Sequence, residues 1–361
     1  MAHRSIRDID WVLLIVALAI CGLGVLQIYS AARGSPWHDA WWKQIIWMCA
    51  ALILMWLISI VDYHTLLGQV PVLYVVSILV LLATFVVGQQ VWGSRRWIGL
   101  AGMTLQVSEF VKLVLVLLVA RFLTELKTSH LEVRDLLKLG GLIGLPMLLV
   151  IKQPDLGTAL TYLPILAVGV FLAGLRWQYA AVVIVTVALV LPVAWFSLKD
   201  YQKARLVTFL DPNQDPKGSG YQVIQSKIAV GAGGMWGEGV TRGTQTQYRF
   251  LPVPWTDFIF SAFAEEHGFV GVIVALGLYF LLLMQIVQNA QTAPDKAGMY
   301  ICMGIGAVLL FHVLVNVGMV VGRMPVTGIP LPLMSYGGSN IMSVFLMLGL
   351  VNNVRLRRFV N

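Results

Sequence analysis

Apolar blocks of roughly 18–23 residues recur along the whole chain, and no other feature of the sequence constrains the fold as strongly. A helix of about 20 apolar residues is long enough to cross a hydrocarbon core of about 30 Å. Charged residues make up only 12% of the chain, whereas a typical soluble domain has about 25%. A transmembrane β-barrel would instead alternate in character at every second residue. The sequence therefore predicts an all-α, polytopic membrane protein.

We predict about ten membrane spans in a single domain that covers residues 1–361. The connection between the seventh and eighth spans, residues 197–259, is a polar loop of about sixty residues, and loops of this length are usually functional. The first apolar block follows Arg4 and Arg7, but many similar blocks come after it, so we interpret it as a retained span and not as a signal peptide. The predicted spans are residues 10–30, 41–60, 70–88, 106–125, 136–152, 157–174, 178–196, 260–288, 298–320 and 338–354.

The distribution of Lys and Arg over the short connections predicts the orientation, because cytoplasmic loops carry an excess of both. It places both termini in the cytoplasm and the long loop outside. The outer pair Arg95 and Arg96 goes against this rule, and either a phosphate-bearing substrate or an interfacial anchor beside Trp92 and Trp97 would explain it. The predicted cytoplasmic set is Arg4, Arg7, Lys127, Arg134, Lys138, Arg176, Lys296, Arg355, Arg357 and Arg358, and the outer set is Arg33, Arg95, Arg96, Lys152 and Arg323.

Charge and cysteine content exclude several classes of function. The net charge of +8 is concentrated in the loops, where it favours anionic lipid head groups or a phosphorylated substrate. Nucleic-acid binding would need a soluble basic domain, which this sequence lacks. Cys21, Cys49 and Cys302 each lie within an apolar block and form no CxxC or Cys/His cluster. We therefore expect neither a disulfide framework nor a zinc site, and interpret the cysteines as small packing residues.

The stretch from Gly231 to Gly271 carries the most unusual charges. Asp257, Glu265 and Glu266 stand at the edge of an apolar block, where carboxylates are costly to desolvate and suggest function by default. The residues alone leave two interpretations of Asp257 open, a catalytic group or an N-terminal residue that favours the helix dipole.

Two other motifs place charge close to membrane helices. Glu109 and Lys112 in SEFVKL share a helix face, which favours a structural ion pair over direct catalysis. Asp155 in QPDLGTA either caps the following helix or contacts a substrate. No metal site is predicted, because Asp211 and the nearby Asp215 precede prolines and are typical turn residues.

The connections carry further signals. Apolar positions from Tyr221 to Val230 predict a short helix on the membrane surface, and the glycine-rich run from Gly231 to Gly243 is either a mobile loop or backbone that lies close to a sugar or phosphate. Prolines and glycines interrupt the run from Gly322 to Asn340 at membrane depth, which is tolerated only where backbone is buried in protein or lines a wet cavity. We expect this run to fold over the loop that holds Asp257.

Taken together, these stretches resemble the SEDS family (shape, elongation, division and sporulation) of bacterial peptidoglycan glycosyltransferases. The resemblance covers nearly the whole chain. GTQTQ before FLP is more similar to the RodA branch, which acts in cell elongation, than to the FtsW branch. Val107, Val253 and Trp255 depart from the family pattern of Pro, an acidic residue and His, which puts a proton relay through that His in doubt. The motifs are GSRRWIGL, SEFVKL, QPDLGTAL, FLDPNQDPKGSGYQVIQSKIAVG, GTQTQYRFLP, TDFIFSAFAEEHG and RMPVTGIPLPLMSYGGS.

The resemblance implies a reaction and a set of roles. Lipid II units are joined into glycan strands by inverting transfer, with Asp257 as the base and undecaprenyl pyrophosphate as the leaving group. Glu265 would raise the pKa of Asp257 by like-charge repulsion if the eighth helix began early enough. The implied substrate-binding residues are Arg205, Arg95, Arg96, Arg323, Asp155 and Gln245, and the supporting residues are Glu109, Lys112 and Glu265.

The resemblance also implies a setting in the bacterial inner membrane, with the active site on the outer face. The implied partners are lipid II, membrane lipids and a class B penicillin-binding protein. No cofactor is required by any motif, although a divalent cation is an open alternative. A lipid II flippase and a structural scaffold are the competing functions. The polar motifs cluster at the outer edge and no convincing internal repeat is found, which favours an enzyme over a transporter.

Overall fold

The computed structural model describes residues 9–91, 94–100, 103–126, 131–175, 200–211 and 218–358, together with positions 181 and 196. The predicted seventh span at 178–196 lies almost entirely outside these residues, as does Asp215. The helices are α1 (Trp11–Ala32), α2 (Ala40–Ile60), α3 (Tyr63–Val87), α4 (Val107–Thr124), α5 (Val133–Lys152), α6 (Leu156–Leu160), α7 (Leu163–Leu172), α9 (Asp200–Leu210), α10 (Ser219–Ala232), α11 (Thr244–Gln247), α12 (Ile259–Gln291), α13 (Lys296–Val320) and α14 (Gly338–Arg357).

Six of the described helices are long and apolar enough to cross a membrane, namely α1, α2, α3, α12, α13 and α14. The fourth, fifth and sixth predicted spans are also helical, as α4, α5 and the pair α6 and α7, but they do not meet the same criteria of length and hydropathy. The helix α3 begins earlier than predicted because the Asp62 carboxylate accepts a hydrogen bond from the His64 backbone N–H at 2.9 Å and caps it.

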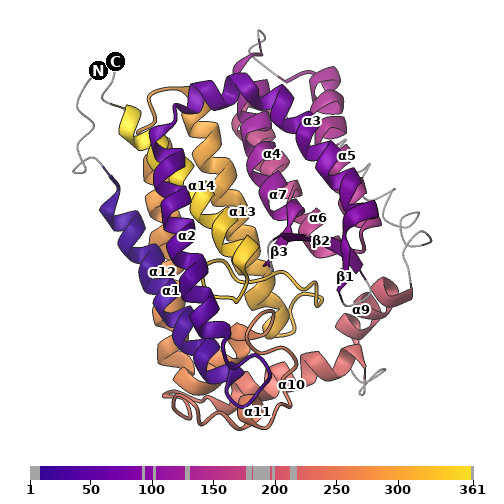
Figure 1. The fold of residues 1–361 in the computed structure, drawn as a ribbon, viewed down its shortest axis with the longest axis vertical. Coiled ribbons are helices and arrows are strands. Elements are labelled where there is room, and N and C mark those ends of the chain that lie inside the picture. The colour runs from indigo at the N-terminus through magenta and orange to yellow at the C-terminus, as the bar shows by residue number, and fades with distance from the viewer. Residues whose placement is uncertain are drawn as a thin grey trace.

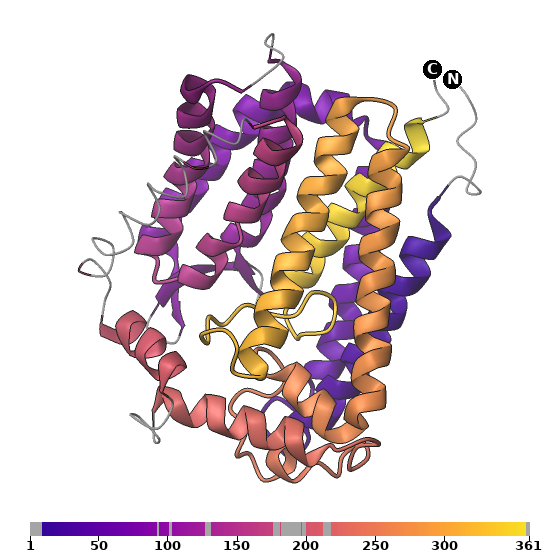
Figure 2. The same cartoon turned by 180° about the vertical axis from the view of Figure 1, so that it is seen from behind.

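The helices run side by side as a bundle, with α1, α2, α12, α13 and α14 on one side and α3, α4, α5 and α7 on the other (Figures 1 and 2). α14 is the most buried of the six long helices and packs closely on α2. A Cβ at Gly349 would lie 2.8 Å from the Met55 carbonyl oxygen, and one at Gly338 would lie 2.8 Å from the Trp47 ring. The two glycines therefore let these helices approach more closely than larger residues would allow.

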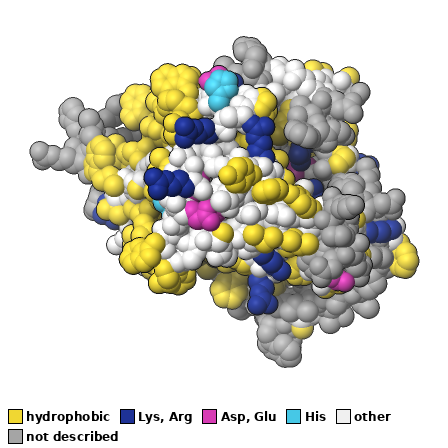
Figure 3. Space-filling model, turned by 90° about the horizontal axis from the view of Figure 1, so that it is seen from below, with side chains coloured by type: hydrophobic (Ala, Val, Ile, Leu, Met, Phe, Trp, Pro, Cys, Tyr) yellow, Lys and Arg dark blue, Asp and Glu magenta, His cyan; other side chains and the backbone are white. Residues whose placement is uncertain are grey.

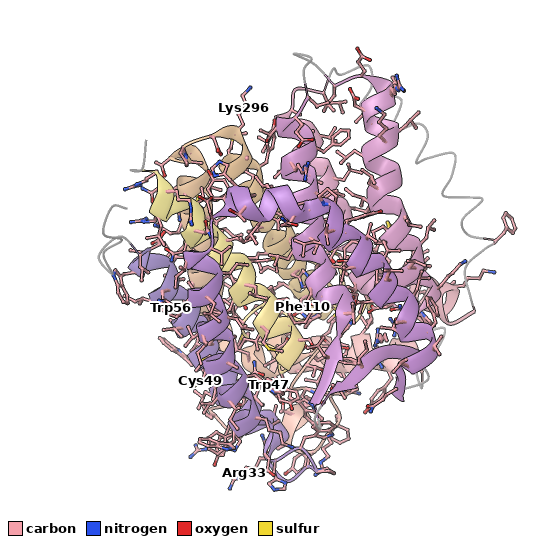
Figure 4. All side chains as sticks on the ribbon, turned by 45° about the horizontal axis from the view of Figure 1, so that its top comes forward. Arg33, Trp47, Cys49, Trp56, Phe110 and Lys296 are labelled. Carbon is pink, nitrogen blue, oxygen red and sulfur yellow. The ribbon has the colours of Figure 1, made fainter. Side chains whose placement is uncertain are left out.

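One residue from each of the two predicted charge sets can be placed relative to the bundle. Figure 4 shows Lys296 at one end and Arg33 at the other. Trp56, which it also labels, lies on α2 with 59% of its surface exposed. The end of α1, next to Arg33, and the start of α13, at Lys296, therefore lie at opposite ends of the bundle.

A small antiparallel sheet was not predicted. It comprises β1 (Gln89–Val91), β2 (Ser94–Leu100) and β3 (Met103–Gln106) in the order β1-β2-β3. Three such short strands give too little alternation to stand out from a loop. The Ser339 hydroxyl accepts a hydrogen bond from the Gln106 backbone N–H at 2.9 Å, so the last strand is fixed to the start of α14.

The end of the molecule that carries the sheet also carries α9, α10, α11 and the connections around them (Figure 1). The helix predicted at Tyr221–Val230 is confirmed and extends to the bounds of α10. α9 was not predicted. Figure 3 shows this end from below, where Lys and Arg side chains are spread among hydrophobic ones.

Candidate active site

Asp257 lies in the connection that leads into α12, just before the N-cap residue Phe258. The buried amide of Asn316, on α13, donates to the Asp257 backbone carbonyl at 3.0 Å and to the Ile329 carbonyl at 2.8 Å. One side chain thus holds two separate loops together. The position of the aspartate is set by a rigid helix and not by its own loop alone.

The connection from Gly322 to Gly337 folds against the Asp257 loop, as the sequence predicted. The Ser335 hydroxyl donates to the Thr256 carbonyl at 2.7 Å, and the Tyr336 backbone N–H donates to the Trp255 carbonyl at 2.9 Å. Gly328 has a φ of +72°, and a Cβ built there would lie 3.4 Å from the Asp257 Oδ2 atom. The backbone conformation therefore favours glycine, and a Cβ here would be in van der Waals contact with the carboxylate.

The groups around Asp257 shift the pKa of its carboxyl in opposite directions. The residue is only partly exposed, and burial raises the pKa of its carboxyl above the ordinary value. The guanidinium groups of Arg96 and Arg205 and a hydrogen bond from Thr256 act to lower that pKa, and the Asp155 carboxylate acts to raise it again. The net result is a pKa of Asp257 above that of an ordinary aspartate.

Asp155 and Arg96 form the nearest fixed ion pair. Arg96 Nη1 lies 3.2 Å from Asp155 Oδ1. The same carboxylate accepts from the Thr158 backbone N–H at 3.1 Å and from Gln106 Nε2 at 2.7 Å, so its predicted capping role is confirmed. A contact between Asp155 and substrate stays a prediction. The Arg96 Nε atom is buried without a hydrogen-bond partner, which leaves donor capacity at this position.

The remaining predicted substrate-binding residues are dispersed. Arg205, on α9, is partly buried and acts on Asp257 through its charge. Arg323 is exposed just beyond α13 and is not among the groups that shift the pKa of Asp257. The side chain of Arg95 lies outside the described residues. The Gln245 side-chain oxygen is buried without a partner.

Glu265 does not act on Asp257 in the way that the sequence suggested. Because α12 begins at Ile259, Asp257 is not on the same helix face. Instead, the Glu265 carboxylate accepts from the backbone N–H groups of Gln245 and Thr246 at 2.7 and 3.1 Å. It also accepts from the Thr246 hydroxyl at 2.6 Å. Glu265 therefore orders the connection that contains α11.

Glu266 fixes the same region to α1. Its carboxylate accepts from the Ser30 hydroxyl at 2.5 Å and from Gln27 Nε2 at 3.3 Å. The Ser30 hydroxyl in turn accepts from the Thr241 backbone N–H at 3.0 Å. The glycine-rich run is thus held in place by two buried glutamates.

The predicted ion pair between Glu109 and Lys112 is confirmed, with Lys112 Nζ 2.8 Å from Glu109 Oε2 and both side chains almost fully buried. Lys112 Nζ also lies 3.1 Å from His312 Nε2, and the other ring nitrogen of His312 lies 3.0 Å from the Pro330 carbonyl. The Ser343 hydroxyl donates to Glu109 at 3.3 Å. This buried network connects α4, α13 and α14 to the loop that packs on Asp257.

Sequence reasoning missed Asn316, Gln106 and Gly328 in the site. Asn316 had a signal: His312 and Asn316 are two polar residues four apart in an apolar block, which places them on one helix face. Gln106 and Gly328 had none, because their roles depend on Asp155 and Asp257, which are distant in sequence.

The arrangement suits group transfer with charge development. A carboxylate with a raised pKa can accept a proton near neutral pH, and fixed guanidinium groups beside it can stabilise negative charge on a leaving group. Within the part of the chain that the structure describes, no three His, Cys, Asp or Glu side chains gather as a metal-binding group.

Comparison with known proteins identifies extensive similarity. Residues 10–358 match the family model FtsW/RodA/SpoVE, which is described as "Cell cycle protein". The chain is 34% identical to the peptidoglycan glycosyltransferase RodA of Treponema pallidum, over 99% of this chain and 100% of that relative. It is 38% identical to the peptidoglycan glycosyltransferase MrdB of Escherichia coli strain K12, over 97% of this chain and 94% of that relative.

Two solved structures share the whole fold. One comes from work on how a peptidoglycan synthase complex coordinates polymerisation and crosslinking. It is 37% identical, with a TM-score of 0.84, and the match covers 98% of this chain and 99% of that chain. The other is the rod shape determining protein RodA of Thermus thermophilus, at 31% identity and a TM-score of 0.72, over 97% of this chain and 98% of that chain.

Proposed function

The chain belongs to the FtsW, RodA and SpoVE family, and from this membership we propose that it is a RodA-type peptidoglycan glycosyltransferase that polymerises lipid II during cell elongation. Its similarity to two named peptidoglycan glycosyltransferases over nearly its whole length supports this function. The observation that carries the mechanism is the partly buried Asp257, clamped by Asn316 and flanked by the charges of Arg96 and Arg205.

Asp257 acts as the general base. Its carboxylate removes the proton from the 4-hydroxyl of the acceptor sugar while the hydroxyl oxygen attacks the anomeric carbon of the donor. The bond between that carbon and the pyrophosphate oxygen breaks, and undecaprenyl pyrophosphate leaves with the bonding electrons. Attack opposite the leaving group inverts the anomeric centre. The raised pKa of Asp257 makes it a stronger base than an ordinary aspartate.

Arg96 and Arg205 stabilise the charge that develops on the pyrophosphate. Arg96 is fixed by its ion pair with Asp155, so it need not reorganise during the reaction. Arg323, Arg95 and Gln245 are further candidates for contacts with the substrate. Magnesium ions bound to substrate phosphates commonly take one or two carboxylates from protein. Asp155, which pairs with Arg96, and Asp257, which is under the influence of both arginines, are the candidates for this role.

The proposed topology has about ten spans, with both termini in the cytoplasm. The end that carries Arg33 and the loops around Asp257 then faces outward, where the lipid-linked substrate is presented. Six apolar helices support a multi-pass protein of the bacterial inner membrane. The loop at 197–259 belongs to the outer face in this arrangement.

A class B penicillin-binding protein is the proposed protein partner. One solved relative comes from work on a peptidoglycan synthase complex that coordinates polymerisation and crosslinking. A glycan polymerase needs a transpeptidase to crosslink its product. Lipid II is the substrate, and membrane lipids surround the bundle.

The test is polymerisation of fluorescently labelled lipid II by the purified full-length chain, with and without a cognate class B penicillin-binding protein. We expect lysozyme-sensitive polymer from the wild type and none from Asp257→Asn, which keeps the shape of the side chain and removes the base. The same proteins in liposomes, assayed for movement of lipid II between leaflets, address the flippase. Transport without polymer would contradict the proposed function.

A further inference from the structure

A line of hydrogen bonds leads from the buried ammonium of Lys112 into the connection between α13 and α14. Lys112 Nζ lies 3.1 Å from His312 Nε2, and His312 Nδ1 lies 3.0 Å from the Pro330 carbonyl oxygen. The N–H of the same peptide unit, which belongs to Leu331, donates to the Ser335 hydroxyl at 2.9 Å. The proposed mechanism uses neither His312 nor Ser335.

The line ends at the peptide bond that precedes Asp257. The Ser335 hydroxyl donates to the Thr256 carbonyl at 2.7 Å, and this carbonyl belongs to the peptide unit that joins Thr256 to Asp257. Figure 2 shows the connection between α13 and α14 beside the lower end of α13. Buried groups on α4 and α13 are therefore connected to the backbone of the proposed base.

The chemistry of its two ends fixes the direction of each bond in this line. A lysine ammonium can only donate and a backbone carbonyl can only accept. His312 Nε2 therefore accepts from Lys112, which leaves the imidazole proton on Nδ1, where it is donated to the Pro330 carbonyl. The Ser335 hydroxyl accepts from the Leu331 N–H and donates onward. Hydrogen bonds that point the same way polarise and strengthen one another.

We infer that His312 is a positioning residue for glycosyl transfer, held by Lys112 as the neutral Nδ1–H tautomer so that it fixes the loop from which Ser335 orients the peptide unit of the base. The imidazole has to be neutral, because a protonated ring would present a second donor to the ammonium. This inference rests on the proposed function and adds one residue to it. His312 acts through the loop and not by contact with the substrate.

Burial makes this line rigid. Lys112, His312 and Ser335 are each at most 2% exposed, and hydrogen bonds are stronger in such surroundings than in water. Irregular backbone at membrane depth needs partners from the protein itself. Asn316, one turn after His312 on α13, donates to the neighbouring Ile329 carbonyl at 2.8 Å. Two side chains of one helix thus hold consecutive carbonyls, and a shift of this loop would displace the proposed base.

Four variants of the full-length chain separate positioning from packing. His312→Leu removes both ring nitrogens, whereas His312→Gln keeps one group that donates and one that accepts. Ser335→Ala interrupts the line at its other end. Tyr74→Phe is the matched control, because it also removes one side-chain hydrogen bond to a backbone carbonyl, from Tyr74 on α3 to Leu142 on α5 at 2.8 Å.

The first readout is the steady-state rate of lipid II polymerisation. We expect His312→Leu to lower kcat by about five- to thirtyfold with KM within about twofold of the wild type, as for a misplaced reacting group. His312→Gln should restore kcat to within about threefold of the wild type, and Tyr74→Phe should not change it. A kcat of His312→Leu equal to that of the wild type would overturn the inference, and so would a His312→Gln protein as slow as His312→Leu.

A double-mutant cycle tests whether the two ends of the line act together. His312→Leu combined with Ser335→Ala should be slower than the slower single variant by no more than about twofold, because both changes interrupt the same line. His312→Leu combined with Tyr74→Phe should show the product of the two separate effects. Fully multiplied effects of His312→Leu and Ser335→Ala would show that the residues act independently, which contradicts the inference.

The second readout does not need activity. Hydrogen exchange followed by mass spectrometry reports on the backbone amides of residues 326–337 and 254–260. We expect exchange in both segments to rise by about tenfold in His312→Leu and to stay unchanged in His312→Gln and Tyr74→Phe. If the wild type makes no polymer, the proposed function fails, while exchange still shows whether His312 fixes the loop. Unchanged exchange in a folded His312→Leu protein would overturn the inference.

The tautomer is tested in the wild type, so this result does not depend on the folding of a weakened variant. The ¹⁵N NMR signals of His312 in histidine-labelled protein are assigned by their absence from His312→Gln. We expect a proton on Nδ1 and none on Nε2 from about pH 6 to about pH 9, the range in which an ordinary histidine titrates. A protonated Nε2 at neutral pH would contradict the role assigned to Lys112 and overturn the inference.

Discussion

Asp257 and Glu109 are both carboxylates beside cations, but their surroundings differ in a way that separates chemistry from architecture. Glu109 is almost fully buried, with Lys112 at 2.8 Å and the Ser343 hydroxyl at 3.3 Å. Asp257 takes part in none of the ion pairs within the described residues, but the charges of Arg96 and Arg205 lower the pKa of its carboxyl. A carboxylate held by a buried ammonium and a hydroxyl supports the bundle, whereas one without an ion-pair partner among the described residues can take a proton.

The same change from carboxylate to amide should therefore have opposite consequences at the two sites. Asp257→Asn should lower the polymerisation rate by about 10²–10⁴-fold, which is the usual contribution of a general base. Its thermal stability should be equal to or above that of the wild type. The pKa of Asp257 is raised in the folded protein, so its ionised form costs stability at neutral pH. A marked loss of stability would assign Asp257 to the architecture instead.

Glu109→Gln should lower stability, because it leaves the Lys112 ammonium buried without its counter-charge. Breaking a buried pair in this way typically costs about 3–5 kcal/mol. Thermal unfolding in detergent measures the loss, and Glu109→Leu combined with Lys112→Met should recover most of it, since no lone charge remains. A stable Glu109→Gln protein that cannot polymerise lipid II would contradict the structural role of Glu109.

Asn316→Ala tests whether the clamp positions Asp257. Loss of the amide frees the Asp257 and Ile329 carbonyls, and small displacements of a reacting group cost up to about 10²-fold in rate. We expect kcat to fall by about ten- to hundredfold with little change in KM. Asn353→Ala is the control. It also removes a buried amide, one that donates to the Ile58 carbonyl on α2, and should reduce stability without changing kcat.

Gly328→Ala should have the smallest effect. Gly328 and Gly174 both have positive φ, at +72° and +81°, but only a Cβ at Gly328 would approach Asp257. Both alanine variants should lose about 1–2 kcal/mol of stability through the left-handed backbone. Only Gly328→Ala should also slow polymerisation, by less than about tenfold. Equal activities of the two variants would show that the contact with Asp257 has no effect.

The sequence could predict interactions between residues that are close along the chain, but not those between distant segments. The long helices, the pair of Glu109 with Lys112 and the cap at Asp155 were predictable, because each depends on residues within one block or one turn. The sheet was missed because its strands are short. The effect of Glu265 on Asp257 was predicted only for an early start of the helix, and that condition fails because α12 begins at Ile259. Asn316 and Gly328 reach Asp257 only through the folded bundle.

The most direct test of Asp257 as the base is the pH dependence of kcat/KM for polymerisation, in the wild type and in Arg96→Gln. A base is lost as pH falls through its pKa, so the rate should decline on the acid side, at a pH above the ordinary aspartate range. Arg96 lowers the pKa of Asp257, so Arg96→Gln should move this decline to higher pH, while Arg33→Gln should not move it. An acid decline that stays at the same pH in Arg96→Gln, or none in the wild type, would contradict the account.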